Sequence, residues 1–597
     1  MSKSKNIRNI AIVAHVDHGK TTLVDRLLQD SGTIQEVQDR VMDSDSIEKE
    51  RGITILAKNT GIHYKDYSIN IVDTPGHADF GGEVERTLQM VEGFILLVDA
   101  AEGVLPGTRF VLQKALTLGL RPMVVINKID RKDATIKETQ EQIYDLFLDL
   151  ATEDSQLEFP TLYGSAKLGF MTTDPDVKTD NCNALLDAIV ENVPAPKDES
   201  DSLQLLITNL DHSEFLGPLI SGRVFSGSLK VGDQVVLCKD DAVSKPTRIT
   251  KIWKFLGVEK VEVDQADYGD IVTVAGFEEH PKLGATICHV GKPNPHSYVK
   301  VDEPTLTMYF SVNDSPFSGK EGKLVTSRQI KERLEKELKI NVALRVEDTD
   351  SPEVFKVSGR GQLHLGILIE NMRREGFELQ VSAPEVIYKT IDGVKQEPFE
   401  YVIIDVEEQY RGSVMDNLGQ RKGELRNMTP MSDSRVRLEF EVPAQSLLGF
   451  RSKFLIDTRG TGIMNSSFAG YKPCKGSMQK RLKGALSSME NGLVTAYALD
   501  SLQARGILFV KPGDKVYTGQ IVGEHSRDND LDVNPCKGKK LTNMRASGSD
   551  DSVKLAPPLI MTLEQCMEWI RPDELIEVTP KSIRLRKKIL QASLRKK

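Results

Sequence analysis

The sequence predicts a multidomain α/β protein, and three observations support this fold class. At about 150 residues per domain, the chain of 597 residues corresponds to roughly four domains. The first 190 residues contain four near-continuous apolar runs, typical of a parallel sheet covered by helices on both faces: Ile10–Val13, Ile69–Val72, Phe94–Val98 and Met123–Ile126. After residue 200 the runs become short and alternating, with glycines between them, which favours a β-barrel.

The composition excludes several other classes of protein. Hydrophobic residues make up 39% and charged residues 28%, a globular rather than a disordered balance. No run approaches the ~18 apolar residues of a membrane span, so we expect no membrane partner. Six cysteines lie far apart without a CxxC pair, which favours a reducing interior over disulfides or zinc. We therefore expect a cytoplasmic protein.

Changes of pattern along the chain predict five domains. A polar, proline-containing stretch at 193–200 indicates a linker, and two later segments mix strands with helical patterns such as Ser327–Leu338 and Gly361–Glu375. The predicted domains are an α/β domain at 1–198, a β-barrel at 199–300, α+β (ferredoxin-like) domains at 301–388 and 389–480, and a mixed, mainly β domain at 481–597.

Charge is unevenly distributed between the two parts of the chain. Residues 401–597 carry 32 Lys and Arg against 23 Asp and Glu, a net charge of +9, whereas residues 1–400 carry a net charge of −18. The basic C-terminal third of the chain favours contact with a polyanion, and rRNA and tRNA are the candidates. The alternative is that the net charges of the two parts differ by chance and indicate no partner.

A phosphate-binding loop is predicted directly after the first apolar run. Residues 14–21 read Ala-His-Val-Asp-His-Gly-Lys-Thr and precede an amphipathic pattern over Thr22–Leu28, although Ala14 stands where the general pattern has glycine. Backbone N–H groups at a helix N-terminus bind phosphate, a lysine pairs with the β and γ oxygens, and a threonine hydroxyl can ligate Mg²⁺. The predicted nucleotide-binding residues here are Asp17, His18, Gly19, Lys20, Thr21 and Thr22.

Three further motifs end predicted strands, where open α/β sheets bind ligands. In Asp73-Thr74-Pro75-Gly76-His77, Asp73 can hold Mg²⁺ and the Gly76 N–H can contact a γ-phosphate. The second motif is Asn127-Lys128-Ile129-Asp130, and the third is Ser165-Ala166-Lys167. The Asp130 carboxylate can accept hydrogen bonds from the two adjacent donors of guanine, whereas adenine would leave it unpaired. An ATPase is therefore a remote alternative. The remaining predicted nucleotide-binding residues are Asn127, Lys128, Asp130, Ser165, Ala166 and Lys167.

A threonine between the first two motifs completes the pattern. In Glu50-Arg51-Gly52-Ile53-Thr54-Ile55, a loop hydroxyl can join Mg²⁺ coordination only while a γ-phosphate is present, which gives two states. The segments AHVDHGKT, RGITI, DTPGH, NKID and SAK closely resemble those of translational GTPases, the class of elongation factors G and Tu. The resemblance implies a P-loop GTPase G domain, with GTP or GDP and Mg²⁺ as cofactors and a monovalent cation as a further candidate.

Residue roles follow from the resemblance. It makes Thr54 a magnesium ligand together with Thr21 and Asp73, and it makes His77 the catalytic residue that orients the attacking water. No arginine finger is identified in the sequence, so we expect slow hydrolysis by the free protein. By family analogy, the ribosome would stimulate hydrolysis by placing His77 with its sarcin–ricin loop.

The rest of the chain narrows the resemblance to one branch of the family. Residues 222–233 resemble the second domain of these factors, 359–368 the third domain of elongation factor G, and 411–415 with 421–423 its fifth. There is no room for the subdomain inserted in the G domain of elongation factor G, or for its fourth domain between 386 and 395. Of the two branches with this outline, the loop at 539–548 (KKLTNMRASG) resembles the one that acts in large-subunit assembly rather than the LepA-like one.

The C-terminal loop and tail are the predicted RNA-binding elements. Cations with neutral hydrogen-bonding groups suit phosphate and sugar edges of folded RNA, and the predicted contacts are Lys537, Lys539, Lys540, Asn543 and Arg545. The tail Lys581–Lys597 carries eight Lys and Arg and no acid. It is predicted either as a helix packed on the domain with one basic face or as a direct RNA contact.

The resulting functional hypothesis is a ribosome-associated GTPase that hydrolyses GTP to GDP and phosphate. Its implied role is large ribosomal subunit assembly and stress- or cold-dependent translation. The expected partners are the large-subunit rRNA, including the sarcin–ricin loop, and an A-site tRNA, and the expected state is a monomer. The alternatives are a LepA-like factor acting on translocating ribosomes and an rRNA-binding assembly scaffold with incidental turnover.

Overall fold

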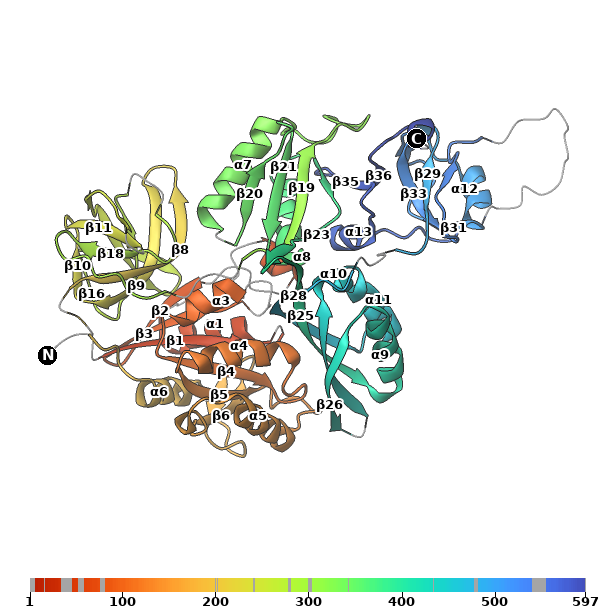
Figure 1. Cartoon of the computed structure of the whole chain (residues 1–597). Coiled ribbons are helices and arrows are strands. Elements are labelled where there is room, and N and C mark those ends of the chain that lie inside the picture. Colours follow the sequence, from red (N-terminus) through yellow and green to blue (C-terminus); the bar gives the residue numbers. More distant parts are fainter. Residues whose placement is uncertain are drawn as a thin grey trace, which may run out of the picture. The chain divides into compact units, whose positions relative to one another are not determined.

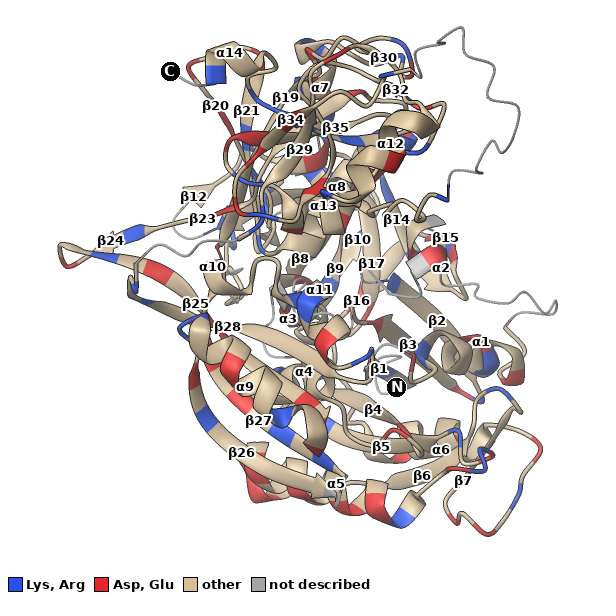
Figure 2. Ribbon diagram, turned by 90° about the vertical axis from the view of Figure 1, so that its right-hand side faces the viewer, with Lys and Arg blue, Asp and Glu red and all other residues tan. Residues whose placement is uncertain are grey.

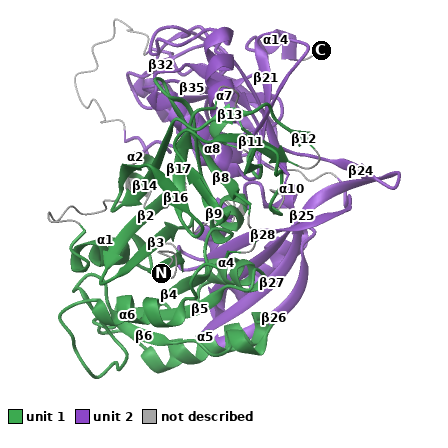
Figure 3. Ribbon diagram, turned by 90° about the vertical axis from the view of Figure 1, so that its left-hand side faces the viewer, with its two compact units in different colours: residues 1–302, 339–343 green, residues 303–338, 344–597 purple. Residues whose placement is uncertain are grey.

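The computed structural model describes most of the chain as two compact units. It describes residues 6–15, 17–33, 46–51, 58–75, 81–198, 200, 202–239, 242–277, 281–298, 303–341, 343–432, 434–476, 481–538 and 554–595. The first unit comprises residues 1–302 and 339–343, and the second comprises residues 303–338 and 344–597 (Figure 3).

The N-terminal domain, residues 6–198, is built on a mainly parallel sheet. Among its described residues the strand order is β2-β3-β1-β4-β5-β6-β7 (Figure 1). β1 pairs in parallel with β3 and β4, and β5 pairs in parallel with β4 and β6. All four predicted apolar runs lie within strands of this sheet, which confirms the α/β prediction. The strands are β1 (Ile7–Ala14), β2 (Lys58–Tyr64), β3 (Tyr67–Asp73), β4 (Gly93–Asp99), β5 (Arg121–Asn127), β6 (Thr161–Ser165) and β7 (Phe170–Thr172).

Helices on both faces bury two separate cores against this sheet. α1 places Leu23 and Leu27 in the core of one face, while α4 places Leu112 and Leu116 in the core of the other. Each such burial stabilises the domain by about 1.5–3 kcal/mol. The helices are α1 (Lys20–Asp30), α2 (Ser46–Arg51), α3 (Gly81–Leu88), α4 (Pro106–Thr117), α5 (Ile136–Leu150) and α6 (Asn183–Asn192).

The barrel, residues 202–298, is antiparallel, as the glycine-separated runs predict. Its main sheet has the order β12-β11-β18-β8-β9-β17-β14-β15, with β13 paired to β11, and β10 pairs with β16. Inward-facing residues such as Ile220, Val224 and Val272 form its core. The strands are β8 (Gln204–Ser213), β9 (Gly217–Ser226), β10 (Ser228–Lys230), β11 (Gln234–Lys239), β12 (Ala242–Val243), β13 (Thr247–Arg248), β14 (Lys251–Leu256), β15 (Glu259–Val263), β16 (Gln265–Asp267), β17 (Ile271–Ala275) and β18 (Thr286–His289).

In the second unit, residues 389–476 form an α+β domain with its own core. The sheet order is β24-β25-β27-β26 with β28 paired to β25, and the hairpin of β24 and β25 projects from the domain (Figure 2). Basic and acidic residues face each other across its strands, for example Arg437 and Asp405 at 2.7 Å. The elements are β24 (Lys389–Ile391), β25 (Val394–Glu407), α9 (Arg411–Gln420), β26 (Glu424–Ser432), β27 (Arg435–Pro443), α10 (Ala444–Leu447), α11 (Phe450–Asp457) and β28 (Ile463–Pro473).

Residues 303–386 and the C-terminal segment, residues 481–595, share one sheet. Its order is β20-β21-β19-β22-β35-β36-β33-β29-β34, because β22 pairs with β35 from Leu379 opposite Val578 to Ser382 opposite Leu575. One core also spans both segments. The elements are β19 (Leu306–Val312), α7 (Ser327–Ile340), β20 (Arg345–Asp348), β21 (Val354–Gly359), α8 (Gln362–Arg374), β22 (Leu379–Ser382), β23 (Glu385–Val386), β29 (Ala485–Ser488), β30 (Gly492–Leu493), α12 (Ala496–Gln503), β31 (Gly506–Leu508), β32 (Lys515–Val516), β33 (Gln520–His525), β34 (Leu531–Val533), α13 (Leu563–Trp569), β35 (Glu574–Val578), β36 (Ile583–Lys587) and α14 (Ala592–Arg595).

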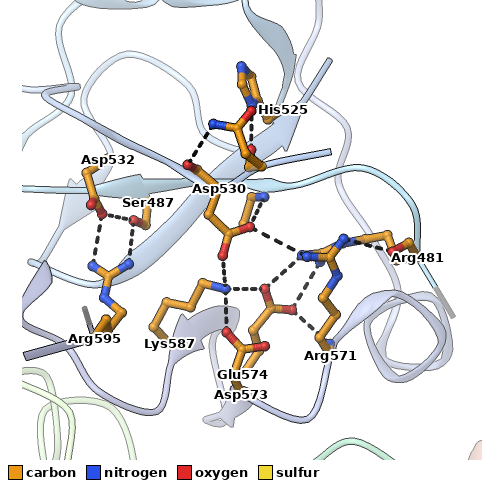
Figure 4. A network of polar contacts seen from close by, with 12 residues as sticks. Arg481, Ser487, His525, Asp530, Asp532, Arg571, Asp573, Glu574, Lys587 and Arg595 are labelled. Atoms are coloured by element: carbon orange, nitrogen blue, oxygen red, sulfur yellow. Dashed lines mark hydrogen bonds and ion pairs between the residues drawn. The ribbon is translucent and has the colours of Figure 1, made fainter. Parts of the chain in front are cut away.

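The tail is not the single helix that was one of the predictions: Ile583–Lys587 is strand β36, and only the short α14, Ala592–Arg595, is helical. β36 lies between β35 and β33, and its cations are paired with acids (Figure 4). Arg584 pairs with Glu577 at 3.2 Å, and Lys587, with 1% of its side chain exposed, pairs with three carboxylates. Pairing to two neighbouring strands and burial of the cations outweigh the local apolar spacing that suggested a helix.

Lys587 fills a carboxylate cluster that would otherwise suit a metal ion. Asp530, Asp573 and Glu574 offer oxygens within 4.8 Å of one another. The Lys587 ammonium lies 2.6 Å from Asp530, 2.8 Å from Asp573 and 2.8 Å from Glu574. Burial alone would lower the pKa of Lys587, but the three carboxylates raise it above its usual value. The protein's own ammonium therefore lies where a metal ion would bind, and Arg481 and Arg571 pair with Glu574 and Asp530 of the same cluster.

The helices of the described part of the chain differ from membrane-spanning helices. None in the described part of the chain combines the length and the apolar character that such a crossing needs.

Candidate functional site

The candidate site lies where four parallel strands of the N-terminal domain end. β1 ends at Ala14, β3 at Asp73, β4 at Asp99 and β5 at Asn127. The register brings these ends level, because Ile12 lies opposite Asp73 and Asp99 opposite Asn127. The edge formed by carboxyl ends of parallel strands is the ligand-binding edge of open α/β sheets.

The loop between β1 and α1 has the backbone shape of a phosphate-binding loop. Asp17 and Gly19 have positive φ angles of 66° and 95°, and α1 begins at Lys20 directly after Gly19. A Cβ atom at Gly19 would lie 2.6 Å from Nδ2 of Asn127, so a side chain does not fit there. The loop therefore brings its N–H groups to the N-terminus of α1, where phosphate oxygens bind.

Lys20 and Asp73 place opposite charges at the centre of the site. The Lys20 ammonium lies 2.8 Å from Oδ1 of Asp73 and also donates to the carbonyl of Thr74. Both side chains are buried, and Thr74 is fixed by a 2.8 Å hydrogen bond from its hydroxyl to the Ile12 carbonyl. Thr21, in the first turn of α1, is half-buried. An ammonium, a carboxylate and a hydroxyl are the groups that phosphate oxygens and a hard cation require.

Asn127 connects two loops that are far apart in the sequence. Its Nδ2 donates to the His18 carbonyl at 2.9 Å, and its Oδ1 accepts a hydrogen bond from the Ala166 N–H at 2.9 Å. Lys128 extends over the same loop and donates to the Asp17 carbonyl at 2.6 Å. The predicted phosphate-binding and base-binding motifs are thus brought together by direct contacts.

Asp99 belongs to this arrangement and was not predicted from the sequence. Its carboxylate is buried and lies 2.7 Å from the Lys128 ammonium, and it accepts a 2.8 Å hydrogen bond from the Ala101 N–H. Burial alone would raise the pKa of Asp99, but these two donors hold it below its usual value. The sequence did offer one signal for Asp99, because this aspartate directly follows the apolar run Phe94–Val98.

The other predicted site residues differ in their exposure to solvent. Asp130 and Lys167 are exposed in the turns after β5 and β6, Ser165 is buried, and Thr22 is exposed. Lys537 is exposed, and its carbonyl accepts a 2.6 Å hydrogen bond from Thr495. The predicted residues outside the described ranges are Thr54, Gly76, His77, Lys539, Lys540, Asn543 and Arg545.

His18 gives the N-terminal domain a specific dependence on pH. Its ring is buried, Nδ1 donates to the Leu97 carbonyl at 3.2 Å, and burial lowers its pKa to about 4. Because an unfolded histidine has a pKa of about 6.5, the stabilisation is complete above pH 6.5 and decreases as the pH falls towards 4. We expect this residue to account for about 2 kcal/mol of lost stability between pH 7 and pH 5.

This expectation can be checked by denaturant unfolding at pH 7 and pH 5. Residue 18 is isolated by comparing the protein with a His18→Asn variant, which cannot titrate. The variant should lose less stability than the original protein on acidification, and equal losses would contradict the assignment.

Family models match four parts of the chain in order. Elongation factor Tu GTP binding domain matches residues 5–195, and Elongation factor Tu domain 2 matches residues 217–288. Elongation factor G C-terminus matches residues 394–482, and TypA/BipA C-terminal domain matches residues 483–592. Together with the site, these matches define a GTP-binding GTPase of the elongation-factor class.

Relatives along the full length define the family. A protein of Bacillus subtilis (strain 168) described as "Large ribosomal subunit assembly factor BipA" is 52% identical over 100% of this chain and 98% of its own length. Proteins with the same description from Escherichia coli (strain K12) and Synechocystis sp. are 52% and 51% identical over 99% and 97% of this chain, and over 98% of their own lengths. The chain belongs to the BipA family. This confirms the predicted translational GTPase and the branch distinguished from LepA-like factors.

A solved structure supports the fold. A crystal structure of a protein from Thermus thermophilus matches with a TM-score of 0.56 and 16% identity, over 79% of this chain and 98% of that chain. At this identity the match concerns the fold alone.

Proposed function

We propose that this chain is a GTPase that acts in assembly of the large ribosomal subunit and that its nucleotide state controls its attachment to the ribosome. The observation that carries this proposal is 52% identity, over the whole chain, to a large ribosomal subunit assembly factor. The GTP-binding domain supplies the nucleotide chemistry, and the C-terminal segment supplies the family-specific part. We further propose a cytoplasmic monomer that acts in stress- or cold-dependent translation.

The residues at the strand ends fit a nucleotide with Mg²⁺. Lys20 would bind the β and γ phosphate oxygens, while Thr21, Asp73 and, by family resemblance, Thr54 would hold the metal ion. When bound, Mg²⁺ supplies charge stabilisation at the phosphate oxygens. Lys20 and Asp73 now pair with each other at 2.8 Å. When the nucleotide binds, Lys20 would pair with phosphate oxygens instead, and Asp73 would pair with Mg²⁺. A monovalent cation is a further candidate at the phosphates.

The second half of the site would select guanine. Lys128 and Asn127 are held by Asp17, His18 and Asp99, so the turn that carries Asp130 starts from a fixed position. A carboxylate at residue 130 accepts both the N1–H and the exocyclic amine of guanine. Ser165, Ala166 and Lys167 would border the base from the β6 side.

Ribosomal RNA is the proposed partner of the C-terminal segment. The exposed Lys537 precedes Lys539, Lys540, Asn543 and Arg545 in the sequence, and this set suits phosphate and sugar contacts rather than base stacking. The tail is a weaker candidate, because Arg584 and Lys587 already pair with buried acids. An A-site tRNA and the sarcin–ricin loop are the further RNA contacts that we propose.

Ribosomes are expected to raise the rate of GTP hydrolysis, and a His77→Ala variant is expected to lose that stimulation. Removal of a group that positions the attacking water reduces the rate by about 100-fold or more. The measurement is phosphate release with and without ribosomes, with GTP affinity as the control that should not change. Equal rates with and without ribosomes would overturn the proposal. If the His77→Ala variant fully supports subunit assembly in cells, the scaffold alternative replaces it.

A further inference from the structure

The cations of the C-terminal segment divide into two groups. One group forms ion pairs with Asp or Glu and comprises Arg481, Lys483, Arg571, Arg584, Arg586, Lys587 and Arg595. The other group is exposed, has no ion pair with any residue that the structure describes, and comprises Arg505, Lys511, Lys515, Arg527, Lys537, Lys554, Lys581 and Lys588. Cations bind an RNA backbone by replacing the counterions of its phosphates, so the second group marks the surfaces that can bind RNA.

Two of the unpaired cations are held at the N-terminal end of α12. The hydroxyl of Thr495, the N-cap of this helix, donates to the Lys537 carbonyl at 2.6 Å. Leu493, two residues before the cap, lies opposite Lys515 in the small sheet of β30 and β32. These contacts fix the backbones of Lys515 and Lys537 near the start of the helix, while both side chains are exposed.

Three further unpaired cations are held at the C-terminal end of α12. Nε2 of Gln503, the last residue of the helix, donates to the Lys554 carbonyl at 3.2 Å. The Arg505 carbonyl accepts a 2.8 Å hydrogen bond from the Ser526 N–H, which brings the backbone of Arg527 beside it. All three cationic side chains are exposed. Unpaired cations therefore lie at both ends of a helix of eight residues, which is about 12 Å long.

The face of α12 between these two ends carries an exposed aromatic ring. Leu499 and Leu502 pack into the core of the C-terminal segment, beside β31 (Figure 1). Tyr497 lies on the opposite side of the helix and is 46% exposed. It makes no hydrogen bond or ring contact with the described residues. Asp500 is the only acid in the helix, and it accepts a 3.1 Å hydrogen bond from Gln503.

We propose that this face of α12 binds unpaired RNA: a base stacks on Tyr497, and the phosphates on either side of that base contact the cations at the two ends of the helix. Bases of single strands stack on exposed aromatic rings, and their backbones follow lines of cations. Bases inside a duplex already stack on one another and offer the ring no free face. The inference rests on the proposed function, which assigns ribosomal RNA to this segment. It adds base stacking, for which residues 538–553 contain no aromatic side chain.

The test of the ring measures binding of a fluorescently labelled single-stranded adenylate decamer to the full chain, by anisotropy over a series of salt concentrations. Tyr497→Ala should weaken binding at least about fivefold, whereas Tyr497→Phe, which keeps the ring, should stay within about twofold of the original protein. Neither substitution should change the salt dependence, because neither removes a charge. Binding of an RNA duplex of the same length should not respond to Tyr497→Ala.

The test of the cations uses the same decamer. A variant with both Arg505→Ala and Arg527→Ala should bind more weakly. Its slope of log affinity against log salt should be lower by about 1.4, since each phosphate contact on a single strand contributes about 0.7. Lys581→Ala is the matched control, because Lys581 is equally exposed and unpaired among the described residues but lies in the turn between β35 and β36. This control should leave the slope unchanged.

Four outcomes would decide the question. Equal affinity of Tyr497→Ala and the original protein for the single strand would overturn the inference. An equal loss on the single strand and the duplex would also overturn it, because stacking requires a free base. If Tyr497→Ala weakens binding to large ribosomal subunits but not to RNA, the face contacts a protein and the RNA inference is wrong. If the original protein does not bind large subunits, the proposed function fails instead, and the loss in Tyr497→Ala on the free decamer still decides the inference.

Discussion

An Asp130→Asn variant is expected to lose at least about 100-fold in affinity for GTP and GDP, because an amide cannot accept both guanine donors. Each lost charge-assisted hydrogen bond costs about 1.5–3 kcal/mol, and the amide N–H₂ group would face a donor of the base. The rest of the site should persist, since the contacts of Asn127 with His18 and Ala166 do not involve residue 130.

Xanthosine nucleotides provide the matched test of this assignment. Xanthine has a keto oxygen where guanine has its amine, so the amide introduced by Asp130→Asn could donate to that oxygen and accept from N1–H. Calorimetry should therefore show that the variant prefers XTP to GTP. Asp133→Asn is the control, because Asp133 is an exposed carboxylate three residues away that pairs with Arg131. Unchanged GTP affinity in Asp130→Asn would contradict the proposed base site.

A Lys587→Met variant is expected to destabilise the second unit by about 3 kcal/mol, because removal of one partner leaves buried charge uncompensated. Methionine has a similar size, so the change removes charge rather than volume. Glu574, whose side chain is fully buried, would keep Arg481 at 2.8 Å but lose the ammonium at 2.8 Å. Asp530 and Asp573 are partly exposed and would be hydrated instead.

Tryptophan fluorescence can follow this transition locally. Trp569 lies in the second unit, with the Arg481 guanidinium 3.6 Å from its ring centroid, and Trp253 is the chain's other tryptophan. In a Trp253→Phe background, urea unfolding of Lys587→Met should show an earlier midpoint. Lys588→Met is the control, because Lys588 is exposed directly after the same strand ends. Equal midpoints for the two variants would show that the carboxylate cluster does not need its lysine.

The prediction of the N-terminal domain succeeded because its signals are local. Strands covered on both faces require apolar residues at every position, so runs such as Phe94–Val98 are visible without any partner. The nucleotide motifs follow those runs directly, and parallel strands place their carboxyl ends at one edge. The contacts among Asn127, Lys128 and the loop at 17–19 are those that this placement anticipated.

The C-terminal region is mainly β, as predicted, and the prediction was incomplete only for the tail, whose structure depends on distant partners. β36 is basic and apolar at mixed spacing, and its neighbours in the sheet begin at Glu574 and Gln520. Nothing near Lys587 in the sequence indicates that Asp530 lies beside it. Asp99 was missed for the same reason, since its partner Lys128 follows a different strand, β5.

The amino-acid sequence by itself determined the order of the domains, the nucleotide motifs and the family, because each depends on residues that are close together in the chain. Only the tertiary structure decided which charges are paired inside the protein and that residues 303–386 share a sheet with the C-terminal segment. These features join residues separated by about 50 to 200 positions, and backbone pairing and burial of charge depend on which groups meet in space.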